Sequence, residues 1–225
     1  MTPSRRSSGP SPRSPGKRPR PSRGEPVRLR SLVVVTQPTV EPVSLAEAKA
    51  QLSLLPDQMD DDELIVGQIA TARRMAEQRL GVALAAQQLR ARWEPSQDGW
   101  RISADGYGQP TLTLPRVPML TGSGYPVAVD VDGVAVSSST YTVDADAGEI
   151  RFSTRPMIPY ASTLTVTYWA GPAGRIAPQI RSAMLLTVGH LYANREAVVA
   201  DGSQPAILPL AIETLLASES VTGRY

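Results

Sequence analysis

The chain of 225 residues contains no cysteine, a single histidine, His190, and a single phenylalanine, Phe152. The absence of cysteine excludes disulfides and thiolate metal sites. With only one histidine, most pairs of a nucleophile and its general base are excluded too. Leucine, valine, isoleucine, alanine and methionine must therefore form most of the core.

Long apolar runs and catalytic motifs are also missing. The longest apolar run, residues 183–188, is far shorter than the roughly 18 to 20 residues of a transmembrane helix, and no apolar segment of a secretory signal follows the basic N-terminus. The sequence has no HExxH, GxSxG or phosphate-loop motif. We therefore expect no membrane partner, no enzymatic activity, no catalytic residue, and no metal or cofactor.

Basic charge is concentrated at the N-terminus. Residues 1–30 carry nine basic side chains and one acid, a net charge of +8, whereas residues 31–225 carry fourteen basic and twenty acidic side chains, a net charge of −6. The nine basic residues are Arg5, Arg6, Arg13, Lys17, Arg18, Arg20, Arg23, Arg28 and Arg30. Seven prolines and six serines accompany them, and such a segment cannot bury enough surface to offset its chain entropy. We predict that residues 1–38 form a disordered basic arm.

Two interpretations of this arm remain open. Clustered arginines bind nucleic acid or an acidic partner through counterion release, so the nine basic residues are candidate contacts for DNA or for such a partner. Alternatively, the segment is an unselected extension or the product of a misassigned start codon.

Helical patterns flank the middle of the chain. Ser44 and Glu47 have the spacing of a capping box, and Gly81 is a candidate C-cap for a second helix. Pro178 suits the first turn of a third helix, and a last short helix follows Leu-Pro at 208–209. The apolar stripe predicted for the second helix consists of Ile65, Ile69, Ala72, Ala76 and Leu80.

The middle, residues 87–174, has the pattern of short strands separated by turns. Asp132-Gly133 predicts a two-residue hairpin, and residues 144–148 predict a second turn. Both turns resemble calcium loops faintly but lack the ligand spacing of an EF-hand. The predicted fold is therefore α+β: a small helical bundle, with two N-terminal and two C-terminal helices (39–86 and 175–225), a β insertion (87–174), and the disordered basic tail before them.

The lone histidine lies in the third helix beside a polar cluster. A catalytic base, a pH sensor and a packed helix end are the three interpretations of His190. Its position on the flank of the apolar stripe favours packing. The candidates for helix packing or a subunit interface are His190, Tyr192, Asn194, Arg195 and Glu196.

The order of these segments resembles a known family. EPVSLAEAKAQL, DDELIVGQIATARRMAEQRLGVAL, LPRVPML, YWAGPAGRIAPQIRSAMLLTVGHLYANREAVV and LPLAIETLL resemble the head–tail connector, or head-completion adaptor, proteins of long-tailed bacteriophages and gene transfer agents. The resemblance covers about residues 39–218, and nothing about the arm carries over from it.

The resemblance implies a structural protein of the virion that is not an enzyme. Copies would assemble in the bacterial host cytoplasm into a twelve-fold ring beneath the portal protein. That ring would extend the DNA channel and dock a stopper or tail-completion protein. C-terminal segments of this family often grip the portal, which makes Leu210, Ile212, Leu215, Leu216, Arg224 and Tyr225 the candidate portal contacts.

Two rival functions belong to other classes. A nucleic-acid-binding protein would act through the basic arm, although no base-reading element is evident beside it. A small enzyme or ligand-binding α+β protein would need a convergent polar pocket, and the sequence offers no titratable constellation for one.

Overall fold

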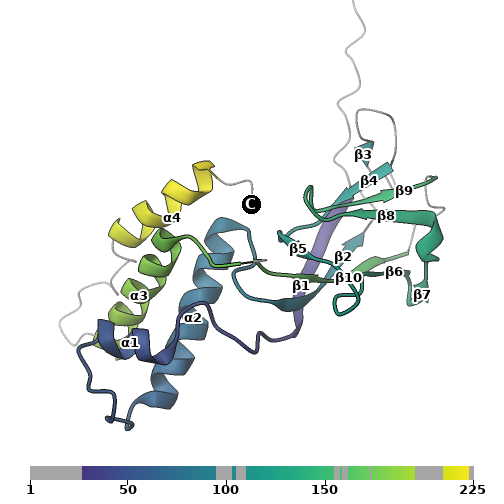
Figure 1. Cartoon of the computed structure of the whole chain (residues 1–225). Coiled ribbons are helices and arrows are strands. Elements are labelled where there is room, and N and C mark those ends of the chain that lie inside the picture. Colours follow the sequence, from purple (N-terminus) through teal and green to yellow (C-terminus); the bar gives the residue numbers. More distant parts are fainter. Residues whose placement is uncertain are drawn as a thin grey trace, which may run out of the picture.

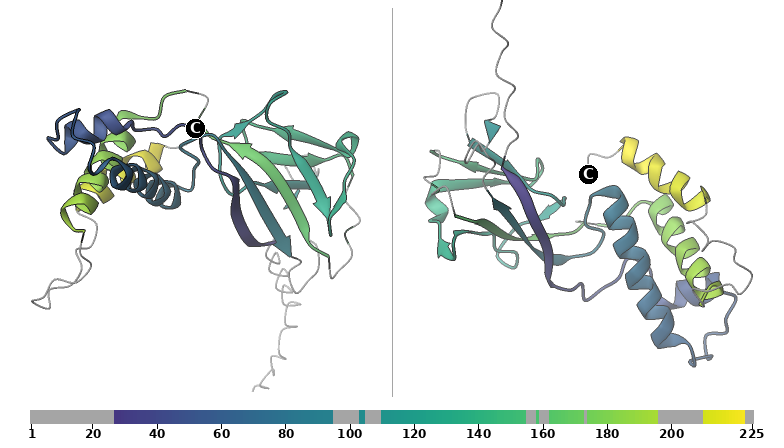
Figure 2. Two further views of the ribbon diagram at one scale, coloured as in Figure 1. Left: turned by 90° about the horizontal axis from the view of Figure 1, so that it is seen from below. Right: turned by 180° about the vertical axis from the view of Figure 1, so that it is seen from behind.

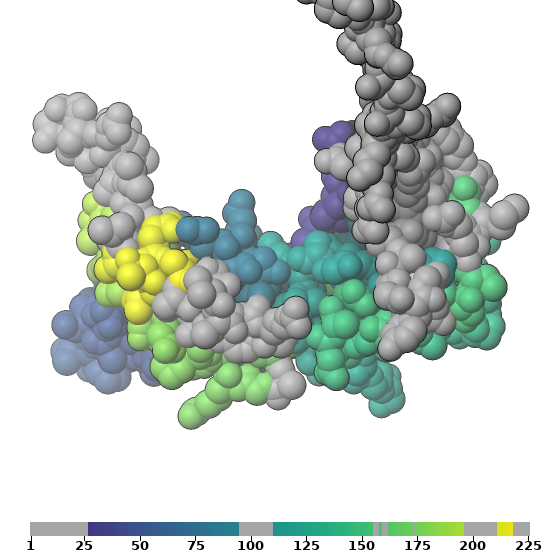
Figure 3. All heavy atoms as spheres, turned by 90° about the horizontal axis from the view of Figure 1, so that it is seen from above, coloured from purple at the N-terminus to yellow at the C-terminus, as the bar shows by residue number. Residues whose placement is uncertain are grey.

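The structure is a computed structural model, and it describes residues 27–94, 103–104, 110–154, 158, 162–172, 174–195 and 210–222. Within these ranges the chain forms two lobes that lie side by side, one helical and one made of strands (Figures 1 and 2). The space-filling view from above shows the same division (Figure 3). The predicted α+β class, with two helices before the main run of strands and two after it, is confirmed.

The helical lobe consists of α1 (Leu45–Gln51), α2 (Asp62–Leu80), α3 (Pro178–Ala193) and α4 (Leu210–Thr222). Ser44 and Glu47 form the predicted capping box at the start of α1, and Gly81 ends α2 with a φ of 72°. Pro178 opens α3 as expected. The apolar stripe of α2 faces inward and packs on α3; this core includes Ile65, Ile69, Ala72, Ala76, Ile180, Met184 and Val188.

The β lobe contains two antiparallel sheets. The first has the order β1-β2-β10-β6-β7, with β5 paired to β10, and the second has the order β3-β4-β9-β8. The strands of the first sheet are β1 (Arg28–Thr36), β2 (Gln87–Glu94), β5 (Met119–Leu120), β6 (Ala128–Val131), β7 (Val134–Ala135) and β10 (Leu164–Ala170). Those of the second are β3 (Ser103–Ala104), β4 (Pro110–Thr113), β8 (Tyr141–Asp144) and β9 (Glu149–Phe152).

The two sheets share one apolar core. Alternation along β2 turns Leu89, Ala91 and Trp93 inward, and Ile150 and Phe152 of β9 meet them from the second sheet. The predicted hairpins are confirmed. Asp132-Gly133 joins β6 to β7 with positive φ at both residues, as a type I′ turn requires, and residues 145–148 join β8 to β9.

The boundary predicted for the N-terminal arm is wrong. Residues 28–36, assigned to a disordered segment ending at residue 38, form β1, which pairs with β2 along its length. The reason is local, because the run Val33-Val34-Val35-Thr36 is β-branched and suits a strand. Leu32 and Val34 pack against the β core. The β lobe is therefore not a single insertion, and residues 1–26 of the predicted arm lie outside the described residues.

Candidate functional site

A buried ion pair lies where the helical lobe meets the β lobe. The side chains of Arg73 and Glu77, one turn apart on α2, are 2% and 0% exposed, and Arg73 Nη1 lies 3.0 Å from Glu77 Oε2. Arg73 Nε also donates to Glu41 Oε2 at 2.8 Å. A buried charge is costly unless it is paired and hydrogen-bonded, so both groups need these partners.

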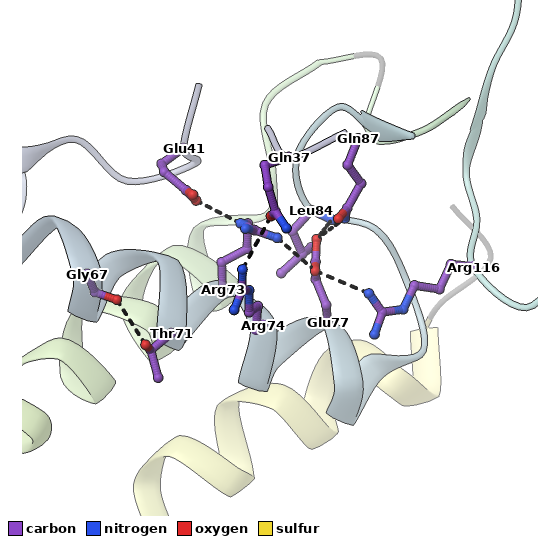
Figure 4. A network of polar contacts seen from close by, with 10 residues as sticks. All are labelled: Gln37, Glu41, Gly67, Thr71, Arg73, Arg74, Glu77, Leu84, Gln87 and Arg116. Carbon is purple, nitrogen blue, oxygen red and sulfur yellow. Dashed lines mark hydrogen bonds and ion pairs between the residues drawn. The ribbon is translucent and has the colours of Figure 1, made fainter. Parts of the chain in front are cut away.

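Glu77 gathers further donors from the β lobe and from the segment that leads to it. The backbone N–H of Leu84 and Nε2 of Gln87 donate to its Oε1 atom at 2.9 and 2.6 Å (Figure 4). Arg116, in the loop between β4 and β5, reaches Oε2 of Glu77 at 3.4 Å. We call Glu41, Arg73, Glu77, Gln87 and Arg116 the junction network. It joins α2 to β2 and to a β-lobe loop, so it holds the two lobes in one relative orientation.

A second polar cluster joins the end of α3 to the start of α2. Asp61 Oδ2 accepts hydrogen bonds from the Tyr192 hydroxyl at 2.5 Å and from Arg195 Nη2 at 2.9 Å. The Arg195 guanidinium also lies 4.1 Å from the centre of the Tyr192 ring. These two hydrogen bonds lower the pKa of the Asp61 carboxyl, and the bond to Asp61 raises the pKa of Tyr192. We call Asp61, Tyr192 and Arg195 the α2–α3 clasp.

His190 lies one turn before Asn194 on α3 and is half-buried. Its Nδ1 atom is 3.3 Å from Nδ2 of Asn194, and that amide also donates to the His190 carbonyl at 2.8 Å. Asn194 therefore caps the C-terminus of α3, and the ring of His190 supports the cap. Glu196, the remaining member of the predicted cluster, lies outside the described residues.

The acidic run that begins α2 is used for ion pairing. Asp62 pairs with Lys49 Nζ at 2.6 Å, and the same ammonium donates to the carbonyls of Pro56 and Gln58 at 3.3 and 2.8 Å. Lys49 thus organises the α1–α2 loop. Within the described ranges, no group of three or more acidic or histidine side chains is placed to hold a metal ion. None of the described helices is both long and apolar enough to cross a membrane.

Some of the predicted portal contacts on the last helix lie in the core of this chain. Ile212 and Leu216, expected to face a portal, are 1% and 5% exposed and belong to the helical core of this chain, with Leu215 packed beside them. Helix α4 lies against α3 and covers its apolar stripe (Figure 1). The side chain of Leu210, and both Arg224 and Tyr225, lie outside the described residues.

Two candidate basic contacts, Arg28 and Arg30, lie on β1, where Arg30 pairs with Glu94 at 3.6 Å. Their neighbours on β2, Arg90 and Arg92, are exposed on the outer face of the sheet, and sequence reasoning missed them as a site. The other seven candidates, Arg5 to Arg23, lie outside the described residues.

Sequence reasoning also missed the junction network. The i,i+4 spacing of Arg73 and Glu77 was a usable signal for the pair, although not for its burial.

No protein-family model matches the chain, and no curated protein sequence matches it. Solved structures do match. A chain from the neck of an empty gene transfer agent particle, computed with C6 symmetry, superposes with a TM-score of 0.59 and 20% identity over 83% of this chain and 95% of the other. A chain from the native virion gives 0.58 and 20% identity over 84% and 94%. One from the native neck, computed with C12 symmetry, gives 0.58 and 19% identity over 84% and 94%. The chain therefore has the fold of a neck component.

Proposed function

We propose that this chain is a structural, non-enzymatic subunit of the neck of a phage-like particle. In this proposal it is a head–tail adaptor, of which twelve copies form a ring beneath the portal protein. The ring extends the channel for DNA and docks the stopper or tail-completion protein. The protein is assembled in the bacterial host cytoplasm and resides in the virion.

The observation that carries the proposal is the extent of the fold match. An alignment that covers 95% of a neck chain and 83% of this one must include residues of both lobes. A shared supersecondary motif would match only one lobe. The C6 and C12 symmetries of the two neck structures support a twelve-membered ring, because a ring of twelve satisfies both.

Exposed apolar side chains support lateral contacts between copies. Leu55, Met59, Leu64 and Val66 are 66%, 71%, 41% and 49% exposed, and they lie in the α1–α2 loop and the first turns of α2. Leu64 and Val66 are two positions apart on α2, so their side chains point to different sides of the helix, and a ring subunit needs a contact surface toward each of its two neighbours. We call these four residues the apolar tip of the helical lobe.

The proposal is tested by co-sedimentation of the full chain with rings of the cognate portal protein. We expect twelve copies of the chain for each portal ring. The variant Leu64→Glu/Val66→Glu is expected to lose stoichiometric binding, because charge at the apolar tip prevents lateral contact. The matched control Glu63→Gln changes an exposed side chain on the same turn and is expected to bind normally. A chain that never sediments with the portal would contradict the proposal.

The rival function, nucleic-acid binding through the basic arm alone, makes a different prediction. Deletion of residues 1–26 would then abolish function while leaving both lobes folded. Under the adaptor proposal the same deletion leaves portal binding intact, because the contacts that build the ring belong to the lobes.

A further inference from the structure

The loop between α1 and α2 exposes apolar side chains beside acids. Leu55 and Met59, two members of the apolar tip, are 66% and 71% exposed. Asp57 and Asp60 lie beside them in the loop and are exposed as well. The loop stands at the end of the helical lobe that is farthest from the β lobe (Figures 1 and 2). It therefore presents an acidic, apolar surface away from the rest of its own chain.

Hydrogen bonds hold this loop in one shape. The N–H of Gln58 donates to the Leu55 carbonyl at 3.2 Å, which closes one turn. The N–H of Asp62 donates to the Met59 carbonyl at 3.1 Å, which closes the next. Lys49 ties the two turns together, because its Nζ atom donates to the Gln58 carbonyl and pairs with Asp62. A partner therefore covers the loop without a large entropic cost of ordering it.

The outer side of the first sheet exposes apolar side chains beside arginines. Residues alternate along β2, so Arg90 and Arg92 point away from the core, and both are exposed. Val33, which is 55% exposed, lies opposite Arg90 on β1. Trp169 lies on the same side of β10, and the ring of Tyr125 packs edge-on against it with centroids 5.6 Å apart. We call these five residues the β face; aromatic residues and arginine are the types that protein interfaces favour.

The charges of the two surfaces are opposite in sign and lack counter-charges. Within the described ranges, neither the arginines of the β face nor Asp57 and Asp60 have an oppositely charged group within 4 Å. The ion pairs there join Arg30 to Glu94, Lys49 to Asp62, Arg73 to Glu41 and Glu77, Arg79 to Glu213, Arg116 to Glu77, Arg151 to Asp144 and Glu149, Arg181 to Glu47, and Arg195 to Asp61.

Two acids border the β face without neutralising it. Asp130 and Asp132 line the same groove as the two arginines, but β10 lies between their strand and β2. Both carboxylates serve the β6–β7 hairpin. Asp130 accepts from the N–H of Gly133 at 3.2 Å, and Asp132 accepts from that of Thr163 at 2.7 Å. The part of the β face formed by β1 and β2 is therefore basic and apolar.

We propose that the α1–α2 loop of one copy docks on the β face of the next copy. Apolar side chains then meet apolar side chains, and the acids of the loop meet the arginines of the face. The partner is a second copy because the two surfaces are complementary, while the junction network keeps the loop of each chain away from its own β face (Figure 1). A contact between two different surfaces repeats head to tail and closes into a ring. The inference rests on the proposed function, for which it names the contact between neighbours.

Charge reversal tests this contact by co-sedimentation of the full chain with rings of the cognate portal protein. Asp57→Arg/Asp60→Arg places like charges at every contact, and so does Arg90→Glu/Arg92→Glu. Each variant alone is expected to lose stoichiometric binding, because opposed like charges are strongly unfavourable at an interface. In an equal mixture, a ring in which the two variants alternate has opposite charges at every contact. We therefore expect the mixture to bind as the parent does.

The matched control is Arg74→Glu/Arg175→Glu, which makes the same change in net charge at exposed sites outside both surfaces. It is expected to bind normally without a complementary variant. Thermal unfolding of all three variants should match that of the parent, because every substituted side chain is exposed.

Crosslinking locates the contact directly, because the chain contains no cysteine. Val33→Cys/Met59→Cys, bound to the portal and treated with a short bismaleimide, should give a ladder of covalent oligomers, since each copy offers one thiol to each neighbour. A mixture of the two single variants should stop at dimers. Val134→Cys/Met59→Cys moves the first thiol to a side chain of β7 that is 71% exposed and should give no ladder.

The outcomes separate this inference from the adaptor proposal. If the parent binds the portal and the charge variants bind equally well, the contact is wrong and the adaptor proposal stands. If each variant fails alone and the mixture fails too, the two surfaces do not meet each other, and the contact is wrong again. If the parent itself does not bind, the adaptor proposal is contradicted and this inference falls with it.

Discussion

The hydroxyl of Tyr192 donates a 2.5 Å hydrogen bond to Asp61 Oδ2, although the two residues are 131 positions apart. Arg195, the residue after the C-cap of α3, donates the second hydrogen bond of the α2–α3 clasp to the same oxygen of Asp61. Strands β2 to β10 lie in the chain between these two residues, whereas β1 precedes both, so the clasp joins two parts of the helical lobe that are far apart in sequence. Tyr192 and Arg195, two members of the polar cluster predicted around His190, thus belong to a connection between helices.

The clasp makes stability depend on pH in a defined direction. Tyr192 and Arg195 depress the pKa of Asp61 below its ordinary value of 3.8 in the folded state. A depressed carboxyl pKa stabilises the fold above that ordinary value, and the contribution is lost as the pH falls through the lower folded value. We expect Asp61→Asn to lower the unfolding temperature at pH 7, and the difference from the parent to shrink below pH about 4. A difference that persists undiminished at low pH, measured by calorimetry, would contradict this.

The α2–α3 clasp also predicts how stability changes at high pH. Its hydrogen bond to Asp61 raises the pKa of Tyr192 above the ordinary value of 10.0. The stabilisation is complete below that value and is lost as the pH rises through the folded pKa. Burial raises the pKa of Tyr141 and Tyr168 as well, so absorbance titration of the phenolates should show several tyrosines of raised pKa. We expect Asp61→Asn to return one of them toward its ordinary range. If the titration of Asp61→Asn matches the parent, the assignment is wrong.

The junction network predicts a large effect from a small chemical change. Glu77→Gln keeps the shape of the side chain but removes the negative charge opposite Arg73 and Arg116. Leaving a buried charge without any counter-charge costs about 3–5 kcal/mol, but Arg73 keeps Glu41 as a partner at 2.8 Å. We therefore expect a smaller loss, about 1–3 kcal/mol, in the free energy of unfolding measured with urea. Glu63→Gln, exposed on the same helix, should stay within about 0.5 kcal/mol of the parent. Equal effects for the two variants would show that the network does not stabilise the junction.

Gly171 tests the close packing where β10 leaves the β lobe. An added Cβ would lie 2.7 Å from Cα and 2.8 Å from N of Ala86, and both atoms belong to the backbone. We expect Gly171→Ala to destabilise the protein by about 1–3 kcal/mol, as overpacking does. Gly174→Ala, with no atom within 4 Å of the added carbon, is the control and should unfold as the parent does. If Gly171→Ala has the stability of the parent, the backbone at residue 171 and the backbone at Ala86 can move apart without a loss of stability.

Features set by local chemistry could be predicted from the sequence. The capping box at Ser44 and the hairpin at Asp132-Gly133 depend on residues within a few positions of one another, so their patterns were sufficient. The helical stripe of α2 was predicted for the same reason. The stripe of α4 was also recognised, but an apolar face does not indicate whether its own chain or a partner covers it. In this structure α2 and α3 cover Ile212 and Leu216.

The features that were missed depend on contacts between distant segments. Strand β1 is not predicted from the sequence because proline and arginine dominate the composition before residue 30. Its partner β2 also begins about fifty residues later. The burial of Arg73 depends on Glu41, and that of Glu77 depends partly on Arg116. Those residues lie 32 and 39 positions away, and no local pattern links them.

The most direct test of the adaptor role is electron microscopy of the full chain bound to rings of the cognate portal protein. We predict an added ring of twelve copies, coaxial with the portal, with the channel continuing through it and the apolar tips in contact between neighbours. Portal rings that stay bare at saturating concentrations of the chain, or that carry scattered copies without rotational symmetry, would contradict the account.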